Sequence, residues 1–333
     1  ETFLLNQLTL QTNLATTAAR CRAAAAGRSV VDFSLRRTHG IDAGMKVARV
    51  SRIVGLDGTS NVAGAVRYGL PASGTMAHSF VQAHGDERAA LRHFAETFGA
   101  SSILLVDTYD TGLGVERAIE VAEEMRARGV ELLGIRIDSG DLAAASRSAR
   151  RRLDEAGFGN LQIFASGDLD EFRIHRLVHD EDAPIDGFGV GSSLGASRYA
   201  PTLSGVYKLT EIDGRLVRKT SEGKATWPGR KQVWRAADWS HDVLALAVEP
   251  APGAEYQPLL EEVVRGGVRR PDPTLDEVHD RFLQQWASLP EALRRVDEDP
   301  DQHTVRVSES LRAATDGVDA RVVEGARAEE GVL

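Results

Sequence analysis

The amino-acid sequence predicts an α/β fold, in which an irregular TIM-like (β/α) barrel is followed by a smaller, mostly antiparallel β-containing second domain. Three observations support this prediction. Short aliphatic or β-branched runs alternate with amphipathic helical stretches, polar residues end those runs, and the alternation stops after Pro201. Strand–helix units of this kind form parallel sheets, because each helix carries the chain back to the start of the next strand.

Each expected strand of the barrel is a hydrophobic run that ends at a polar or glycine-containing turn. The strands are predicted at residues 29–35, 102–107, 130–138, 160–166 and 185–191. The helices are predicted at residues 3–26, 115–128, 142–156 and 169–178, where apolar side chains recur every three or four positions. Asp107, Asp138 and Asp168 follow three of the strands at intervals of about 30 residues, the usual length of one strand–helix unit.

These polar strand ends predict a site at the carboxyl edge of the sheet. In a closed barrel that edge carries the active site, and an open doubly wound sheet would place ligands at the same edge. The barrel is favoured because several strands contribute equivalent acids and no single glycine-rich turn opens the series.

A domain boundary is expected at about residue 205. The barrel and its leading helix take residues 1–205, and a smaller α+β domain takes residues 206–333. Runs 206–212 and 216–220 flank Asp213 and Gly214 in a hairpin pattern, and residues 232–237 predict a further strand. From Thr274 onward charge-rich helices are expected, and the last stretch is expected to fray.

The composition limits the kinds of partner. Of the 333 residues, 42% are hydrophobic and 27% are charged, which is typical of a globular protein. A net charge of −9 argues against binding to nucleic acid or an anionic membrane surface, since both need a basic excess. No apolar run is long enough to span a membrane. The single cysteine, Cys21, excludes an internal disulfide and fits the reducing cytoplasm, where we expect the protein to act.

Four clusters of residues could carry chemistry at the expected barrel mouth. They are DFSLRRTHG (32–40), PASGTMAHS (71–79), GIRIDSGDL (134–142) and GFGVGSS (187–193). The first supplies two arginines, and the second is expected to end a short strand with His78. The third puts Arg136 and Asp138 on one strand face, and the fourth is a turn of the kind that binds phosphate through backbone N–H groups.

Each cluster alone has an ordinary structural explanation. The arginines could pair with surface acids, Arg136 with Asp138 could form an internal salt bridge, and His78 could be a structural histidine. Together at one mouth they predict a site for an anionic, phosphorylated substrate handled with a divalent cation.

Longer stretches resemble the nicotinate phosphoribosyltransferase family. They are DFSLRRTHG, GLDGTSNVAGAVRYGLPASGTMAHSFV, LLVDTYDTGLGV, GIRIDSGDLAAASRSARRRLDEAG, IFASGDLDEFRI, IDGFGVGSSL and GVYKLTEIDG, and they occur in the order of the family. The resemblance implies a type II phosphoribosyltransferase that forms a homodimer with its sites near the subunit interface. Its reaction joins nicotinate to phosphoribosyl pyrophosphate and releases pyrophosphate, with Mg²⁺ as cofactor and ATP as a co-substrate, at the start of NAD salvage.

The resemblance also implies roles for individual residues. His78 matches a histidine that ATP phosphorylates transiently, and it forms the expected catalytic set with Arg136 and Asp138, which would hold the phosphoribosyl group. Phe33 would stack on the pyridine ring, Arg36 would face its carboxylate, and Asp107 belongs to the same rim. The expected phosphate and ribose cradle consists of Ser166, Gly167, Asp168, Gly191, Ser192 and Ser193.

Ser60 bears on the choice between nicotinate and nicotinamide. Related nicotinamide enzymes carry an acid at this place, and its carboxylate would repel a carboxylate substrate. With Ser60 and Arg36, this chain is expected to prefer nicotinate. A nicotinamide or other pyridine phosphoribosyltransferase is the alternative.

Some features depart from the family pattern. Ser34 stands where glycine is usual and Thr38 where alanine is frequent, and both are expected to tighten the pocket beside Arg36. The chain opens at Glu1 inside a helical run, so we expect a missing N-terminal segment that in the family carries an aromatic residue completing a site across the dimer interface. A truncated, non-catalytic homologue that binds phosphorylated ligands is therefore a second alternative.

Overall fold

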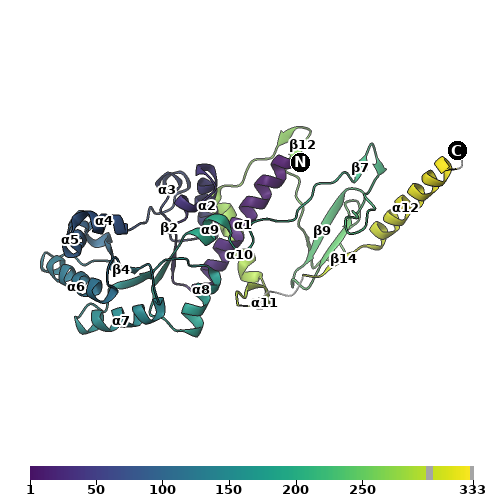
Figure 1. Cartoon of the computed structure of the whole chain (residues 1–333). Coiled ribbons are helices and arrows are strands. Elements are labelled where there is room, and N and C mark those ends of the chain that lie inside the picture. The colour runs from purple at the N-terminus through teal and green to yellow at the C-terminus, as the bar shows by residue number, and fades with distance from the viewer. Residues whose placement is uncertain (298–302, 331–333) are drawn as a thin grey trace.

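A six-stranded parallel sheet forms the first part of the protein in a computed structural model, which describes residues 1–297 and 303–330 (Figure 1). The strands lie in the order β2-β1-β6-β5-β4-β3, and each neighbouring pair is parallel. They are β1 (Ser29–Asp32), β2 (Gly58–Thr59), β3 (Ile103–Leu105), β4 (Gly134–Ile137), β5 (Gln162–Ala165) and β6 (Gly187–Val190).

The curled sheet forms only half of a barrel, so the predicted irregular TIM-like barrel is confirmed only in part. Strands β2 and β3 lie at its two ends and do not pair with each other. β2 has two residues, and the segment after it adds one isolated bridge, between Thr59 and Ala72. Because the chain from there to His78 makes no further ladder, the sheet does not close.

Helices cover the sheet and connect its strands. They are α1 (Thr2–Ala24), α2 (Ile41–Val54), α3 (Val62–Tyr68), α4 (His78–His84), α5 (Glu87–Phe98), α6 (Thr111–Ala127), α7 (Leu142–Glu155), α8 (Glu171–His175) and α9 (Ser192–Ala196). Short 3₁₀ turns occupy Leu35–Arg37 and Gly99–Ser101, and a π-helical turn, Arg176–Asp180, continues α8.

Aspartates begin the helices that follow β3, β4 and β5. The side chains of Asp110, Asp141 and Asp170 accept hydrogen bonds from backbone N–H groups in the first turns of α6, α7 and α8. Such caps satisfy N–H groups that have no partner within the helix, and each stabilises its helix by about 1 kcal/mol. Each helix start is therefore fixed close to the end of a strand.

The predicted strands are confirmed in order and position, but each is shorter than expected. The hydrogen-bonded ladder stops at Asp32, Ile137 and Ala165, before the chain turns toward the next helix. One local prediction is wrong: His78 begins helix α4 and does not end a strand.

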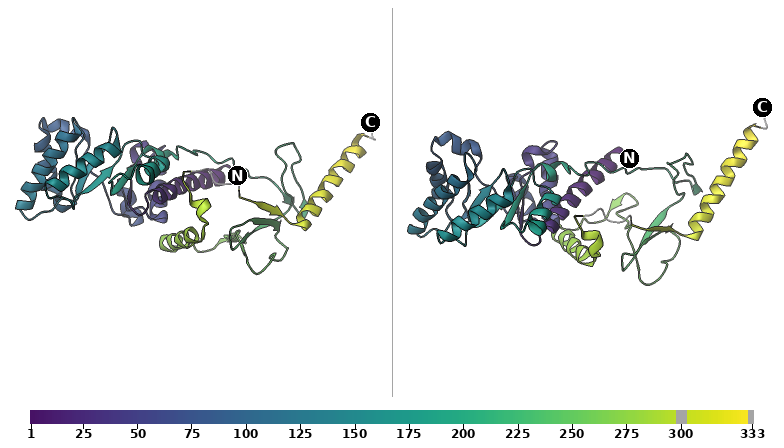
Figure 2. Two further views of the ribbon diagram at one scale, coloured as in Figure 1. Left: turned by 90° about the horizontal axis from the view of Figure 1, so that it is seen from below. Right: turned by 60° about the horizontal axis from the view of Figure 1, so that its bottom comes forward.

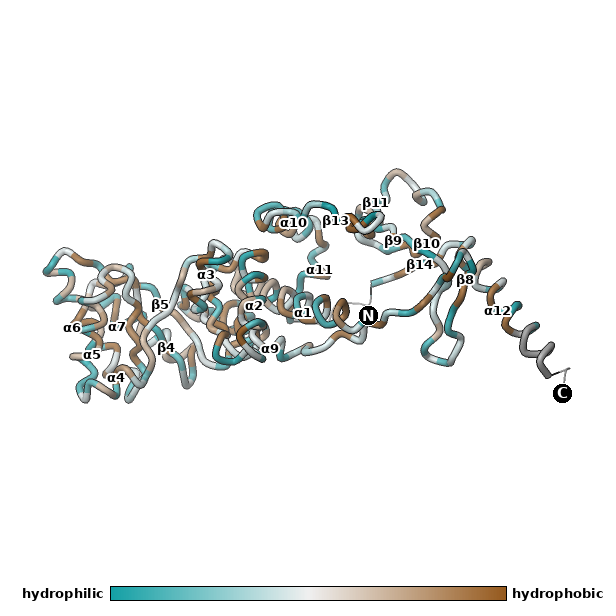
Figure 3. Tube along the Cα trace, turned by 90° about the horizontal axis from the view of Figure 1, so that it is seen from above, coloured by the Kyte–Doolittle hydropathy of each residue, from teal (hydrophilic) through white to brown (hydrophobic). Residues whose placement is uncertain are grey.

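The core lies between this sheet and its helices. Side chains such as Leu104, Ile135 and Phe188 are fully buried, and hydrophobic segments run through the strands and the helices beside them (Figure 3). Burying one such side chain stabilises a fold by about 1.5–3 kcal/mol. Cys21 is buried, and its thiol is free.

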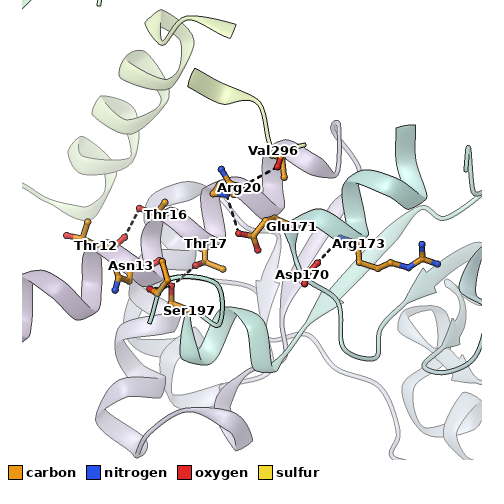
Figure 4. A network of polar contacts seen from close by, with 11 residues as sticks. Thr12, Asn13, Thr16, Thr17, Arg20, Asp170, Glu171, Arg173, Ser197 and Val296 are labelled. Atoms are coloured by element: carbon orange, nitrogen blue, oxygen red, sulfur yellow. Dashed lines mark hydrogen bonds and ion pairs between the residues drawn. The ribbon is translucent and has the colours of Figure 1, made fainter. Parts of the chain in front are cut away.

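A polar network fixes α1 against the elements that follow β5 and β6 (Figure 4). The guanidinium of Arg20 lies 3.2 Å from the buried carboxylate of Glu171 at the start of α8, and it also donates to the carbonyl of Val296. One turn earlier, the hydroxyls of Thr17 and Ser197 lie 2.9 Å apart. Helix α1 therefore supports the back of the sheet at α8 and just after α9.

The rest of the chain forms the second, β-containing part, at the far side of α1 from α4–α7 (Figures 1 and 2). Its main sheet has the order β11-β9-β10-β14, antiparallel except for the β10–β14 pair. The elements are β7 (Glu211–Ile212), β8 (Arg215–Leu216), β9 (Lys231–Ala236), β10 (Asp242–Leu246), β11 (Tyr256–Pro258), β12 (Val264–Arg265), β13 (Val268–Arg269), α10 (Leu275–Ser288), α11 (Glu291–Arg294), β14 (Val305–Val307) and α12 (Glu309–Glu330).

The mostly antiparallel character of this part is confirmed, and its first hairpin turns at Asp213 and Gly214 as predicted. Helix α10 returns to the first part, where His279 bonds the carbonyl of Ile53 in α2. The division at residue 205 stays a prediction. The expected fraying of the last stretch stays a prediction, and residues 331–333 lie outside the described part.

Among the described residues, no helix is both long enough and apolar enough to cross a membrane.

The second sheet gives a prediction about stability and pH. Asp242 is buried and accepts two hydrogen bonds of 2.8 Å from Arg235, which hold the pKa of its carboxyl below the ordinary value of 3.8. A lowered pKa stabilises the fold above about pH 3.8, and this contribution is lost as the pH falls through the lower, folded-state pKa. We expect Asp242→Asn to lower the free energy of unfolding by about 1–2 kcal/mol at pH 7.

Urea denaturation at several pH values between 7 and 3 measures this effect. The difference between Asp242→Asn and the unchanged protein should shrink toward pH 3. Asp213→Asn, in an exposed turn, is the matched control and should show no such trend. A difference that stays constant with pH would contradict the role given to the Asp242 carboxylate.

Candidate active site

Two adjoining cavities lie at the carboxyl ends of β1, β4, β5 and β6. The first, of about 540 Å³, is lined by Phe33, Leu35, Arg36, Ser60, Gly74, Thr75, Met76, Ala77, His78, Ser79, Arg136 and Asp138. The second, of about 240 Å³, is lined by Phe33, Arg36, Arg37, Asp138, Ser166, Gly167, Asp168, Gly189, Gly191 and Ser192. Since Phe33, Arg36 and Asp138 line both, the two cavities adjoin each other.

Asp32 organises the backbone from which Phe33 and Arg36 extend. One oxygen of its buried carboxylate accepts the N–H of Ser34 at 2.8 Å, and the other accepts the hydroxyl of Thr59 at 2.7 Å. Burial raises the pKa of Asp32, and these hydrogen bonds oppose that rise. The carbonyl of Asp32 also accepts the N–H of Ser60, so two walls of the first cavity share one anchor.

The Phe33 ring occupies space that a glycine leaves open. A Cβ atom at Gly189 would overlap atoms of this ring. The guanidinium carbon of Arg136 lies 5.8 Å from the ring centroid, within the range of a cation–π contact. The position of the ring therefore depends on Gly189 and Arg136.

Arg136 brings a largely buried positive charge to the first cavity. One of its terminal nitrogens donates to the hydroxyl of Thr75, and its Nε is buried with no hydrogen-bond partner. Burial lowers the pKa of Arg136, while Asp138 and Asp107 raise it. A guanidinium stays protonated under such shifts, so it can receive an anionic ligand.

His78 faces Asp138 from the first turn of α4. Its Nε2 lies 3.5 Å from an Asp138 carboxylate oxygen, and its Nδ1 lies 3.1 Å from the hydroxyl of Thr108. The His78 side chain is 38% exposed and that of Asp138 is 27% exposed. Both can therefore be reached from the cavity that they line.

Asp138 is held from two sides. One carboxylate oxygen accepts the hydroxyl of Ser166 at 2.5 Å. Its backbone N–H donates to Asp107, whose same oxygen also accepts the hydroxyl of Ser139 at 2.6 Å. The carboxylate of Asp138 therefore has a fixed direction at the boundary of the two cavities.

The second cavity is built from tight turns after β5 and β6. Gly167 has a φ of +91°, and a Cβ there would collide with the carbonyl of Asp138. Asp168 follows with a positive φ of 45°. Gly191 precedes α9, so on the side of these turns the cavity is bounded mainly by backbone and small side chains. Space of this kind lets a phosphate approach backbone N–H groups closely.

The structure brings most of the predicted site residues together. Eleven of the thirteen line the two cavities: Phe33, Arg36, Ser60, His78, Arg136, Asp138, Ser166, Gly167, Asp168, Gly191 and Ser192. Asp107 and Ser193 do not. Asp107 is buried behind Asp138, and Ser193 is buried in α9.

The two departures near Arg36 do not narrow the site, contrary to the expectation. Ser34 is fully buried, and its side chain lies against Gly195 in α9. The hydroxyl of Thr38 lies 2.9 Å from the carbonyl of Leu35 and 3.1 Å from that of Gly40, and its single proton is directed to these carbonyls. Neither residue lines either cavity.

Three residues of the site were not singled out from the sequence. Thr75 and Thr108 bond Arg136 and His78, and Gly189 makes room for Phe33. All three lie within or beside the motifs noted in the sequence, but only the fold reveals their partners. Arg37, one of the two arginines noted in the first motif, lines the second cavity.

In the part of the chain that the structure describes, no group of three or more His, Cys, Asp or Glu residues is arranged to hold a metal ion. Two carboxylates, Asp138 and Asp168, do line the second cavity.

Family models match most of the chain. The model described as the nicotinate phosphoribosyltransferase (NAPRTase) family matches residues 28–224, which include every residue of the two cavities. The model of the nicotinate phosphoribosyltransferase C-terminal domain matches residues 251–315.

The chain belongs to the nicotinate phosphoribosyltransferase family.

Individual relatives agree with this membership. The chain is 46% identical over 316 residues to "Nicotinate phosphoribosyltransferase pncB2" of Mycobacterium tuberculosis, covering 93% of this chain and 67% of that protein. It is 44% identical over 248 residues to the nicotinate phosphoribosyltransferase of Bacillus subtilis, covering 72% of this chain and 50% of that protein.

Two solved structures have the same fold over most of the chain. Human nicotinic acid phosphoribosyltransferase superposes with a TM-score of 0.80 at 26% identity, covering 96% of this chain and 76% of that one. A nicotinate-nucleotide pyrophosphorylase from Pyrococcus furiosus superposes with a TM-score of 0.74 at 29% identity, covering 86% of this chain and 73% of that one.

The packing of Phe33 gives a prediction about this family site. Gly189→Ala places a methyl group where the Phe33 ring lies, so the ring must turn into the first cavity. We expect a loss of about 1–3 kcal/mol in the free energy of unfolding, as for other overpacked sites. A crystal structure of the variant and its denaturation curve measure both effects.

Gly317→Ala is the matched control, because a Cβ at that helical position meets no atom within 4 Å. If Gly189→Ala unfolds like the control and leaves the ring in place, the packing of Phe33 against Gly189 does not fix the ring.

Proposed function

We propose that this chain catalyses the reaction for which its family is named, joining nicotinate to the phosphoribosyl group of phosphoribosyl pyrophosphate in NAD salvage. The observation that carries the proposal is the pair of adjoining cavities. One offers an aromatic face and an arginine, and the other offers glycine-rich turns and two acids. A pyridine carboxylate and a sugar phosphate need these two environments next to each other.

The first cavity suits nicotinate. Phe33 provides a flat face for the pyridine ring, and Arg36 provides a planar guanidinium for its carboxylate. Ser60 lines the same cavity without a charge, so it does not repel that carboxylate. These three residues are the proposed specificity determinants of the ring.

The second cavity suits the phosphoribosyl group and the leaving pyrophosphate. Gly167, Gly191 and Ser192 would bind phosphate oxygens, while Arg37 adds positive charge at the rim. Cleavage of the bond from C1 to pyrophosphate leaves positive charge on the ribosyl ring. Asp138, at the boundary of the cavities, can stabilise that charge while the nicotinate nitrogen attacks C1.

The proposal includes Mg²⁺ bound together with pyrophosphate. Mg²⁺ is usually held by one or two protein carboxylates, phosphate oxygens and water, and Asp138 and Asp168 supply two carboxylates on the second cavity. The residues present therefore fit the ion without a three-residue cluster. When bound, it would neutralise charge on the pyrophosphate.

ATP enters the proposal through His78. A ring nitrogen attacks the γ-phosphorus of ATP, a nitrogen–phosphorus bond forms, and the bond to the leaving ADP oxygen breaks. Water later cleaves the phosphohistidine and releases phosphate. Asp138, 3.5 Å from His78 Nε2, can accept the proton that the ring loses. A homodimer and a cytoplasmic location belong to the same proposal.

Mononucleotide formation tests the proposal directly. The purified protein receives phosphoribosyl pyrophosphate and Mg²⁺ with either nicotinate or nicotinamide, each with and without ATP. We expect product from nicotinate and a higher rate with ATP. His78→Ala should lose the effect of ATP, because no ring nitrogen remains to take the phosphoryl group.

His93→Ala is the control for this substitution, since His93 lies exposed on α5, away from the cavities. Product from nicotinamide alone would overturn the proposed ring specificity. A chain that binds both substrates but forms no product would support the non-catalytic alternative. ATP stimulation that survives in His78→Ala would remove the histidine from the ATP reaction.

Ser60 gives a separate prediction about specificity. Ser60→Asp places a carboxylate in the cavity that would hold the nicotinate carboxylate. We expect the kcat/KM for nicotinate, relative to that for nicotinamide, to fall by about tenfold or more, because like charges repel. Ser60→Asn is the matched control, because asparagine has nearly the same size as aspartate but no charge. It should change the ratio much less. Equal ratios in the two variants would mean that charge at this position does not determine the preference for nicotinate over nicotinamide.

A further inference from the structure

We propose that Thr75 is a positioning residue that holds the guanidinium of Arg136 at the first cavity, where one of its terminal nitrogens is left for the carboxylate of nicotinate. This inference rests on the proposed function and adds to its ring specificity. The carrying observation is the hydrogen bond from the other terminal nitrogen of Arg136 to the hydroxyl of Thr75, which joins β4 to the chain beyond β2.

The Thr75 hydroxyl accepts from the arginine while its own proton is used elsewhere. That proton is directed to the carbonyl of Met76, 3.1 Å away, so a lone pair of the hydroxyl oxygen accepts the N–H of Arg136. A guanidinium has donors only, so the bond needs no change of protonation. The N–H of Ser73 donates to the carbonyl of Thr59 at 3.0 Å, which fixes the segment just before Thr75 to β2.

Thr75 leaves part of the Arg136 guanidinium for a ligand. Among the described residues Arg136 makes no other side-chain hydrogen bond and no ion pair. Its side chain lines the first cavity together with Phe33 and does not line the second. The family resemblance implies a contact of Arg136 with the phosphoribosyl group, whereas its place in the first cavity favours a contact with the ring substrate.

Arg36 and Arg136 bring two positive charges to the same cavity. Burial and the nearby charge of Arg36 both lower the pKa of Arg136, so the two guanidinium groups are close enough to repel each other. Within the described part of the chain neither of them forms an ion pair. A carboxylate bound by both would relieve this repulsion, which favours nicotinate over the uncharged nicotinamide.

Without the Thr75 hydroxyl, two forces would move the Arg136 guanidinium away from this position. Arg36 repels it, whereas Asp138 and Asp107 attract it. Asp138 and Asp107 are fixed by hydrogen bonds at the ends of β4 and β3. The long arginine side chain would therefore be the group that moves, and it would turn toward these acids.

Steady-state kinetics with nicotinate and nicotinamide test this role. Thr75→Val keeps the shape of the side chain and removes the hydroxyl. We expect the KM for nicotinate to rise about fivefold, as for the loss of one hydrogen bond. The kcat, the KM for phosphoribosyl pyrophosphate and the kcat/KM for nicotinamide should change less. Equal effects on nicotinate and nicotinamide, or a rise confined to the KM for phosphoribosyl pyrophosphate, would overturn the inference.

Two further variants serve as controls for Thr75→Val. Thr75→Ser keeps the hydroxyl and should restore the KM for nicotinate. Thr97→Val removes an exposed hydroxyl that bonds the carbonyl of His93 on α5, and it should leave this KM unchanged.

A double-mutant cycle shows whether Thr75 acts through Arg136. Arg136→Lys replaces the planar fork by a single ammonium, which cannot bind Thr75 and a carboxylate in the same geometry. In this background Thr75→Val should raise the KM for nicotinate by less than about twofold, because the interaction between the two side chains is already lost. The same fivefold rise in both backgrounds would mean that Thr75 does not act through Arg136.

Crystal structures separate this inference from the proposed function. In ligand-free Thr75→Val the Arg136 guanidinium should lie closer to Asp138 than in the unchanged protein, and a guanidinium that stays in place would overturn the role of Thr75. If Thr75→Val does not fold, crystals of the unchanged protein with nicotinate decide, since a carboxylate beyond hydrogen-bond distance of Arg136 would contradict the inference. Lack of any nucleotide product would overturn the proposed function instead, while the ligand-free structures would still decide the role of Thr75.

Discussion

The site depends on a carboxylate that does not line it. Asp107, at the end of β3, accepts the backbone N–H of Asp138 and the hydroxyl of Ser139 at the end of β4. These two bonds fix the direction of the chain after the end of β4. They therefore fix the position of Asp138 between the two cavities. They also leave the other Asp107 oxygen buried without a partner, which is costly for a charged group. The nearby positive charge of Arg136, to which Asp107 is electrostatically coupled, offsets part of that cost.

A half-closed barrel is sufficient for this site because the strands that carry it are neighbours. β1, β6, β5 and β4 are consecutive in the sheet, and their carboxyl ends supply the walls of the second cavity and five of the twelve residues that line the first. The glycines at these strand ends are required for different structural reasons. Gly167 allows the chain to pass the carbonyl of Asp138 with a positive φ, whereas Gly189 leaves room for a side chain, the Phe33 ring. Replacing either would move a different wall of the site.

Whether a feature could be predicted from the sequence depends on how far apart in the chain the interacting residues lie. The order of strands and helices was predictable, because hydrophobic periodicity and the aspartates after three of the strands are local signals. The residues that line the cavities were predictable from motifs. The roles of Asp107 and Thr108 were not, because each depends on a partner about 30 residues away in the chain. The incomplete barrel was missed for a similar reason: residues 71–77 have the composition of a strand end, yet they pair only at Ala72.

The gap in the sheet and the chemistry of the site are connected. Thr75 and His78 come from the chain beyond β2, at one end of the sheet, and their partners Arg136, Asp138 and Thr108 come from β4 and the end of β3, at the other. Side-chain contacts therefore join the two ends at the mouth of the half-barrel, where backbone pairing is missing. Below them the interior holds a cavity of about 830 Å³ that shares Ser60, Gly74 and Thr75 with the first cavity. With no strand ladder to hold residues 74–78, their position relies on the same side chains that form the proposed catalytic set. A ligand that bridges Arg136 and His78 would strengthen this closure, so substrate binding and the rigidity of the mouth should be coupled.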